Sequence, residues 1–235
     1  MIRSIFRKKA APLNADKLTL IDYAFSHLGA RSFADLGGVW GVEGGYAFYA
    51  LDQYKPERAV MVDGDPSDLF LQKARGYPSL EFIEGNYGDP AIARQVSGVD
   101  TIFLFDNLLH QVRPDWDEVL EMYGAADTLL VFNQQWRGEQ TVRLIELGED
   151  EYFRNVPHQK DESPYNNLFA KLDTLNADHN RPWRDVFNIW QWGITDDDLL
   201  ARAKHLGYRL AYYKDCGPFG RLPNCSNRAF VFTRR

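Results

Sequence analysis

The chain has 235 residues, of which 45% are hydrophobic and 26% are charged, and its formal net charge is −6. This composition is that of an ordinary globular protein, and the length fits one large domain or one domain with an elaboration. Intrinsic disorder, a collagen-like fibre and a disulfide scaffold are excluded. The net acidity also argues against broad binding to nucleic acid or to anionic membranes, because both need a basic surface.

The beginning of the chain resembles the basic start of a signal peptide without the apolar stretch that should follow it. Asn14, Asp16 and Lys17 interrupt any such stretch, and the basic residues 7–9 are expected to form a solvated tail. Nothing approaches 18 consecutive apolar residues, so no membrane-spanning helix is predicted.

Cysteine usage indicates a reducing compartment. The chain contains two cysteines, Cys216 and Cys225, whose spacing leaves open a pair across a hairpin. Two thiols in a chain of this size are typical of a reduced cytosolic protein. We therefore expect a cytoplasmic location.

The first 135 residues alternate between helical and strand patterns. Apolar residues at helical spacing from Leu18 to Leu28 predict a helix that Gly29 ends. The predicted strands are residues 32–36, 58–62, 80–83, 100–105 and 127–132. The predicted helices between them are residues 42–50, 66–70, 91–96 and 115–123. This alternation predicts an α/β fold, a doubly wound parallel sheet with helices on both faces.

The pattern changes after residue 132. A helix is predicted over residues 140–147, followed by a polar, aromatic stretch without a clean period. Thr195 and Asp198 then predict the start of a helix that ends at Gly207. Two last strands, 208–213 and 228–232, suggest an antiparallel end to the sheet.

A glycine-rich turn follows the first predicted strand, with the pattern Asp35-x-Gly37-x-Val39-x-Gly41. Ligands of doubly wound sheets bind beyond the carboxyl ends of the strands, where glycines let the backbone approach them. Asp63 ends the second strand about twenty residues later, the position from which an acid accepts hydrogen bonds from ribose hydroxyls. Together, the turn and the acid favour an adenosine ligand.

Asp35 discriminates between adenosine ligands. A dinucleotide fingerprint would read G-x-G-x-x-G, and an acidic residue in this turn would repel a pyrophosphate but suits a cation. Residues 33–41 resemble motif I of class I S-adenosylmethionine-dependent methyltransferases, (Asp/Glu)-x-Gly-x-Gly-x-Gly, with Val39 in place of the middle glycine.

Further landmarks of that family follow in order. Residues 60–63 resemble motif II, residues 82–88 the segment that touches adenine (with Asn86 where Asp is frequent), and residues 100–110 motif IV of the small-molecule enzymes. The resemblance implies a Rossmann-like, seven-stranded, mostly parallel sheet with an antiparallel C-terminal strand, and S-adenosyl-L-methionine as cofactor. The implied cofactor-binding residues are Asp35, Gly37, Gly38, Gly41, Asp63, Gly64, Asn86, Tyr87, Asp106 and Asn107.

The domain divisions that follow are an N-terminal tail and helix (1–30), a cofactor-binding half (31–135), a substrate-binding insertion (136–193) and a closing helix with two strands (194–235). The insertion lies where this family varies its substrate pocket. Its aromatic and polar side chains could contact a sugar or a flat ring, or could form a satellite core that holds a cap. The candidate substrate-binding residues are Trp136, His158, Tyr165 and Trp190.

The family implies in-line attack of a substrate nucleophile on a sulfonium methyl group, for which the enzyme aligns the partners. A hydroxyl nucleophile must also lose a proton, and His110, just beyond strand four, is a candidate base; the alternative is a structural histidine. Asp106 is a second candidate catalytic residue. Asp106 and Asn133 are also candidate oxygen ligands for Mg²⁺, with helix capping or a contact with the cofactor's amino group as alternatives for Asp106.

The favoured function is O-methylation of a small molecule, a sugar or polyhydroxylated natural product rather than a phenol. Methylation of nitrogen, carbon or a protein side chain is the alternative within the family, although the Asp/Asn-Pro-Pro-Tyr motif of DNA amino-methyltransferases is absent. An NAD-dependent oxidoreductase and a non-catalytic binding protein are the other classes considered. The expected partner is a small-molecule acceptor, and the N-terminal helix and the insertion are candidate surfaces of a homodimer.

Overall fold

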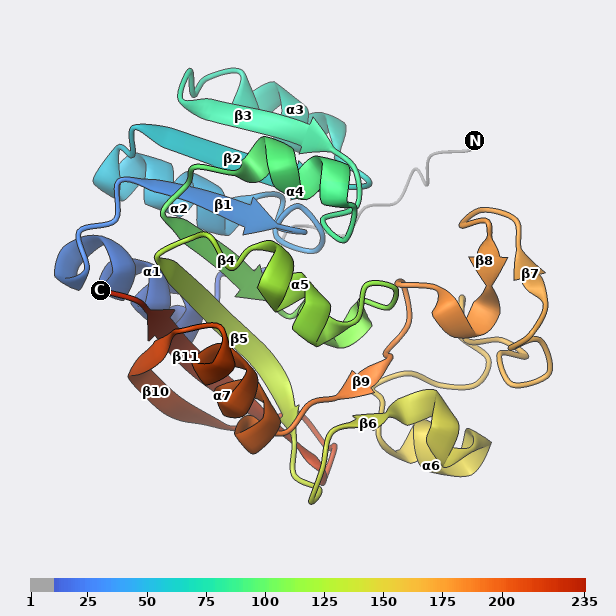
Figure 1. The fold of residues 1–235 in the computed structure, drawn as a ribbon. Helices are drawn as coiled ribbons and strands as arrows, with labels where there is room; N and C mark the ends of the chain where they lie inside the picture. Colours follow the sequence, from blue (N-terminus) through green and yellow to red (C-terminus); the bar gives the residue numbers. More distant parts are fainter. Residues whose placement is uncertain (1–10) are drawn as a thin grey trace.

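A computed structural model describes residues 11–235, so the predicted tail at residues 7–9 lies outside the described residues. Seven strands form one sheet in the order β10-β11-β5-β4-β1-β2-β3 (Figure 1). β1 to β5 are parallel, and β11 runs antiparallel to both β5 and β10. The strands are β1 (Ser32–Leu36), β2 (Arg58–Asp63), β3 (Leu80–Glu84), β4 (Thr101–Phe105), β5 (Thr128–Trp136), β10 (Arg209–Pro218) and β11 (Cys225–Thr233). The predicted Rossmann-like sheet is confirmed.

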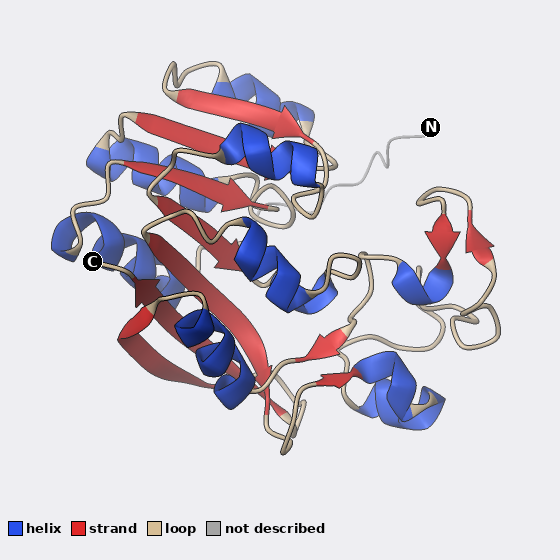
Figure 2. Cartoon of the chain, in the orientation of Figure 1, coloured by secondary structure: helices blue, strands red, loops and turns tan. Residues whose placement is uncertain are grey.

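Helices cover both faces of this sheet (Figure 2). One apolar cluster packs three of them on one face: α1 (Ala15–His27), α2 (Gly45–Tyr54) and α3 (Asp68–Ala74). A second cluster packs three on the other face: α4 (Pro90–Val96), α5 (Trp116–Met122) and α7 (Asp196–His205). The strand interiors are apolar on both sides, which is what a parallel sheet between two helix layers requires.

Local capping signals start several of these helices where the sequence predicts. Asp115 and Glu118 form a capping box at α5, and the Thr195 side chain accepts a hydrogen bond from the backbone N–H of Asp198 at α7. At α3 the cap is Ser67 rather than a turn opened by Pro66, so this helix begins two residues later than predicted. A hydroxyl that accepts from the backbone N–H of Phe70 satisfies a helix donor, which a proline ring cannot do.

β5 is longer than its apolar run suggests. It continues past Phe132 through Asn133 to Trp136, because β11 pairs with it residue by residue as far as Cys225. The polar extension satisfies its backbone groups in this ladder, so its side chains need not be apolar. The predicted end of strand five at Phe132 is therefore wrong.

The insertion between β5 and α7 is built from short pieces: β6 (Val142–Arg143), η2 (Leu144–Leu147), α6 (Glu149–Arg154), β7 (Leu175–Asn176), β8 (Arg181–Pro182), η3 (Trp183–Asp185) and β9 (Trp192–Gly193). The helix predicted over residues 140–147 is wrong. The backbone N–H of Thr141 bonds to Asp198, and that of Leu144 bonds to the Gln191 carbonyl. The N–H of Leu144, which a helix would bond to residue 140, thus has a tertiary acceptor instead.

The insertion lies on the side of the sheet to which the arrowheads of the parallel strands point (Figure 1). It carries its own apolar cluster, which includes Tyr152, Leu168 and Trp190. Cys216 and Cys225 are both free thiols, so the pair left open by their spacing does not form. No helix in the described part of the chain is long and apolar enough to span a bilayer.

Candidate functional site

The candidate site lies at the carboxyl ends of β1 and β4, which are neighbours in the sheet although β2 and β3 separate them along the chain. This is the point where the strand order turns, the usual ligand position in such sheets. Gly37 and Gly41 in the turn after β1 have φ of +72° and +74°, which glycine adopts without strain. The backbone N–H of Gly37 bonds to the Val62 carbonyl at 2.7 Å, joining the turn to β2.

Asp35 is buried directly beneath this turn. A Cβ atom added to Gly38 would lie 2.2 Å from its Oδ2, so only glycine lets the backbone pass over the carboxyl. That oxygen is buried without a hydrogen-bond partner. Burial raises the pKa of Asp35 to about 7, against the opposing effect of Lys17. The structure therefore holds a titratable acid, ready to face a cation, at the floor of the turn.

Asp63 ties the end of β2 to the same turn. Its carboxylate accepts a hydrogen bond from the backbone N–H of Val39 at 3.0 Å and one from that of Asp65 at 2.9 Å. Burial raises its pKa, while these backbone donors oppose the shift. Asp63 thus organises the glycine turn, and each of its oxygens has capacity for a further donor.

The segment after β3 and the end of β4 complete this edge. The Tyr87 hydroxyl donates to the Asn107 carbonyl at 2.9 Å, and the Asn107 amide donates to the Leu36 carbonyl at 2.6 Å. Asn107 keeps a buried Oδ1 without a partner, and Asn86 accepts a bond from the backbone N–H of Gly88. The structure thus brings together the predicted cofactor-binding residues of β1, β2, β3 and β4.

Asp106 has partners that its sequence position does not reveal. Its carboxylate forms an ion pair with Lys17 of α1 and accepts a bond from the Gln134 amide at 2.6 Å. The Lys17 ammonium lies over the rings of Tyr46, Phe105 and Phe132, at 5.1, 5.7 and 5.0 Å from their centroids. Aromatic faces stabilise a cation at such distances.

These contacts do not support the predicted magnesium site. Lys17 already supplies a cation to Asp106, and the Asn133 amide donates to Gln135 at 2.8 Å instead of facing Asp106. Because successive strand residues point to opposite faces, Asn133 points away from the face on which Gln134 meets Asp106. No cluster of three or more His, Cys, Asp or Glu residues suited to a metal occurs among residues 11–235.

His110 lies on the 3-10 helix η1 (Leu108–His110) that follows β4, and its Nδ1 is 2.8 Å from the Ile189 carbonyl. A carbonyl oxygen can only accept, so Nδ1 carries the proton and Nε2 is the basic nitrogen of the neutral ring. Burial lowers the pKa of His110, which keeps the ring neutral near pH 7. The Ile189 carbonyl of the insertion therefore selects the tautomer in which Nε2 is free to accept a proton.

Three of the four predicted substrate-binding residues gather beside His110. The Trp190 ring meets His110 edge to face at 6.1 Å, and His158 stacks on Tyr165 at 4.4 Å. Tyr165 and Trp190 are buried and belong to the apolar cluster of the insertion, so they shape its core. Trp136 is different: its ring covers Gly138 and Gly193, which places it at the base of the insertion.

Comparison with solved structures shows which fold this is. Over 94% of this chain and 99% of the other, the structure is similar to a candidate S-adenosylmethionine-dependent methyltransferase from Listeria monocytogenes, with a TM-score of 0.57 and 11% identity. The N-terminal domain of EvdMO1, solved in the presence of S-adenosylhomocysteine and D-fucose, matches with a TM-score of 0.56 and 12% identity over 96% and 85% of the two chains. The chain has the Rossmann-like fold of these methyltransferases.

A third similar structure is the 1,6-didemethyltoxoflavin-N1-methyltransferase of Burkholderia thailandensis, with its substrate and S-adenosylhomocysteine bound. Its TM-score is 0.53 and its identity 11%, over 93% of this chain and 78% of that one. No protein-family model matches the sequence, and no curated protein matches it either. At these identities, the methyltransferase fold is what the likeness establishes.

Sequence reasoning missed Lys17 and Gln134, the two partners of Asp106. A signal for Lys17 was present: it precedes Leu20, Ile21 and Ala24 by three, four and seven residues, so it falls on the buried face of α1. Gln134 had no such signal, because its position in a strand depends on the pairing of β5 with β11.

Proposed function

We propose that this protein is an S-adenosylmethionine-dependent methyltransferase that acts on a hydroxyl group of a small molecule. The observation that carries the proposal is the buried, unpaired carboxyl of Asp35 under a glycine turn in a methyltransferase fold. A sulfonium compound is a cation, and an ionised acid without a partner in this turn suits it. The similar structures with bound S-adenosylhomocysteine support the same cofactor.

The residues present fit this cofactor. The turn of Gly37, Gly38 and Gly41 provides close backbone approach, Asp63 and Gly64 lie where ribose hydroxyls are expected, and the rest of the set supplies polar groups. The remaining candidates are Asp35, Asn86, Tyr87, Asp106 and Asn107. The bound cofactor would supply a methyl group activated by its positive sulfur.

His110 is the proposed base. The proposed role of Asp106 is to stabilise the protonated form of His110 by its negative charge. As a C–O bond forms and the C–S bond of the donor breaks, the hydroxyl proton would pass to Nε2 of His110. Ionised Asp106 favours the imidazolium that results. Lys17 and Gln134 hold the Asp106 carboxylate in place, and no step is assigned to a metal ion.

Methylation of a nitrogen is the second candidate, supported by the N1-methyltransferase among the similar structures. A sugar or polyhydroxylated acceptor remains the first, supported by the polar insertion and by D-fucose in the EvdMO1 structure. A product assay with a labelled methyl group, followed by mass spectrometry of the product, separates O- from N-methylation.

The first experiment is calorimetric titration with S-adenosylmethionine and S-adenosylhomocysteine. Wild-type protein should bind both, and Asp63→Ala should weaken binding by about 10–100-fold, since a hydrogen bond to a charged group is lost. Glu57→Gln, an exposed residue at the other end of the same strand, is the matched control and should leave binding unchanged. Folded wild-type protein that binds neither compound would disprove the proposal.

A further inference from the structure

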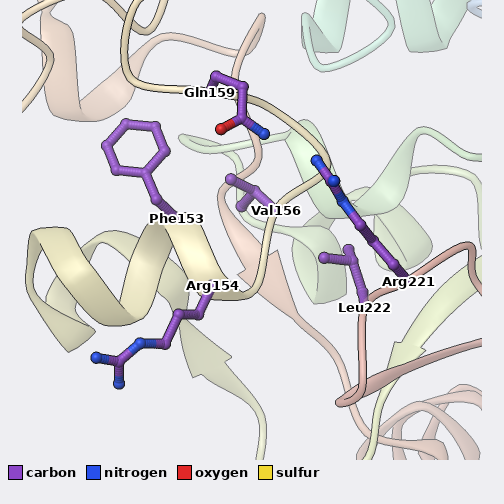
Figure 3. A pocket seen from close by; sticks show the side chains of 6 residues that line it. All are labelled: Phe153, Arg154, Val156, Gln159, Arg221 and Leu222. Atoms are coloured by element: carbon purple, nitrogen blue, oxygen red, sulfur yellow. The ribbon is translucent and has the colours of Figure 1, made fainter.

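A hollow of about 610 Å³ opens between the insertion and the connection from β10 to β11, lined by Phe153, Arg154, Val156, Gln159, Arg221 and Leu222 (Figure 3). This volume is within the range of small-molecule sites. Three of the lining residues are apolar, two are arginines and one is an amide. None of the six, all in the described part of the chain, carries a carboxylate.

The two arginines are not equivalent. Arg154 forms an ion pair with Glu151 three residues earlier, and its side chain points away from the other lining residues in Figure 3. Arg221 points toward Gln159, and Val156 and Leu222 lie beside them. Within residues 11–235, Arg221 forms no hydrogen bond or ion pair. Its guanidinium therefore offers donors without a protein acceptor.

Neighbouring residues link the hollow to the proposed catalytic centre. Gln159 follows His158 directly in the chain, and His158 bonds to Glu162 at 3.0 Å. On the other side, His110 touches Trp190, which stacks on Phe219 at 5.7 Å, two residues before Arg221. These contacts join the lining of the hollow to the part of the insertion that packs against His110.

The Glu162 carboxylate leaves the Arg221 guanidinium able to bind an anion. The pKa of Glu162 is lowered by its hydrogen bond with His158 and, to a smaller extent, by Arg221. Glu162 is engaged by His158 and does not pair with the guanidinium, so Arg221 keeps its capacity for a planar, bidentate contact with a carboxylate or phosphate.

We propose that the methyl acceptor carries an anionic oxygen group, a carboxylate or a phosphate, which Arg221 and Gln159 bind in this hollow. The apolar face of the acceptor packs on Val156 and Leu222, and the group to be methylated points toward His110. This assignment names the substrate class of the proposed methyltransferase and rests on that function.

The test measures binding of three probes to the full chain by calorimetry: D-glucuronate, D-glucose 6-phosphate and the neutral methyl α-D-glucopyranoside. At least one anionic sugar should bind more tightly than the neutral one, and the tighter anion identifies carboxylate or phosphate. Arg221→Gln should raise the dissociation constant of that anion at least tenfold. Arg154→Gln, which removes the same charge from a side chain directed away, should change it less than twofold.

Three results would overturn the anionic acceptor: equal weakening by both variants, neutral sugar binding as tightly as the anions, or no anion binding by protein that binds S-adenosylhomocysteine. Each preparation is therefore also titrated with S-adenosylhomocysteine. Unchanged cofactor binding in Arg221→Gln shows that the variant is folded. Absence of cofactor binding in the wild type instead disproves the methyltransferase function, whatever the sugars do.

Discussion

The carboxyl edge of the sheet and the insertion after β5 are held by different kinds of contact. β1 is bonded on both sides along its length, to β2 and to β4, by backbone ladders. The insertion has three-residue and four-residue 3-10 turns and strands of two residues. Side chains replace the ladders there: Gln191 donates to the carbonyls of Arg184 and Val186, and Tyr152 donates to that of Trp190.

The two regions of the candidate site should therefore respond differently to substitution. Backbone hydrogen bonds between strands position the glycine turn and its acids. This arrangement tolerates side-chain changes elsewhere, because it does not depend on side chains. A few buried side chains set the insertion, which makes it sensitive to single substitutions. His110 joins the two regions, because it lies on η1, which follows β4, and bonds to Ile189 of the insertion.

The largest expected effect is on the rate of methyl transfer when His110 is replaced. His110→Ala should lower the rate of methyl transfer by about 10²–10⁴-fold, the range for loss of a general base. In the wild type, the rate should rise with pH through a pKa below 6.5 and then stay level, because burial lowers the pKa of His110 and the neutral ring is the active form.

His110→Asn separates the base from a structural role. Its amide can replace the Nδ1 donor to the Ile189 carbonyl but cannot take up a proton. Loss of rate in both variants, measured with labelled methyl donor at saturating acceptor, supports the base. A His110→Asn enzyme as active as wild type would show that His110 is structural.

The next largest expected effect is a loss of stability confined to the insertion. Asp185 is 2% exposed and pairs with Arg143 at 2.7 Å and with Arg113 at 3.1 Å. Asp185→Ala should destabilise the insertion by about 3 kcal/mol, since a partly buried guanidinium loses its partner. Hydrogen exchange should then rise in residues 137–193 and stay low in β1 and β4.

The control is Asp173→Ala, which removes an ion pair of the same insertion with Arg184. Asp173 has an 81% exposed side chain, so its loss should cost less than about 1 kcal/mol. Equal destabilisation by the two variants, or loss of protection throughout the sheet, would contradict the separate stabilisation of the two regions.

Asp35 should make cofactor binding depend on pH. With a pKa of about 7, the carboxyl is protonated below that pH, so affinity for the cationic S-adenosylmethionine should rise about tenfold between pH 6 and pH 7.5 and then level. Asp35→Asn should bind more weakly and without this rise. Calorimetry across the pH series measures both, and an identical pH profile in the variant would exclude Asp35 as the titrating group.

The raised pKa of Asp35 also predicts how the free energy of unfolding changes with pH. The folded state retains a proton on Asp35 that the unfolded chain releases above its ordinary pKa of 3.8. The free energy of unfolding should therefore fall as pH rises from about 4 to 7, by about 1.4 kcal/mol per unit at most, and the Asp35→Asn variant should lack this contribution. Urea denaturation at each pH measures it.

The smallest expected effect concerns the attachment of α1 to the sheet edge. Lys17→Met keeps the aliphatic stem but removes the ammonium from Asp106 and the aromatic rings, and should cost about 1 kcal/mol. Lys214→Met, which breaks the exposed pair of the same helix with Asp16, should cost less in urea denaturation. The opposite order would indicate that Lys17 contributes no more than a surface ion pair.

The part of the fold that follows from neighbouring residues was predictable. Apolar runs bounded by glycine and acidic residues predicted all seven strands of the main sheet, and the caps at Asp115 and Thr195 predicted two helix starts. The glycine turn and the acids at the ends of β1 and β2 were identified for the same reason: each signal lies within a few residues of the structure that it determines.

The tertiary structure decided what depends on distant partners. β11 extends β5 to Trp136 and thereby turns Asn133 away from Asp106, while α1 brings Lys17 to that carboxylate from 89 residues away in the chain. The backbone donors of residues 141 and 144 find acceptors in α7 and before β9, which replaces the predicted helix. The sequence by itself determined the elements and the turn that bears the acids; long-range pairing determined which polar side chains meet there, because local spacing carries no information about partners brought together only by folding.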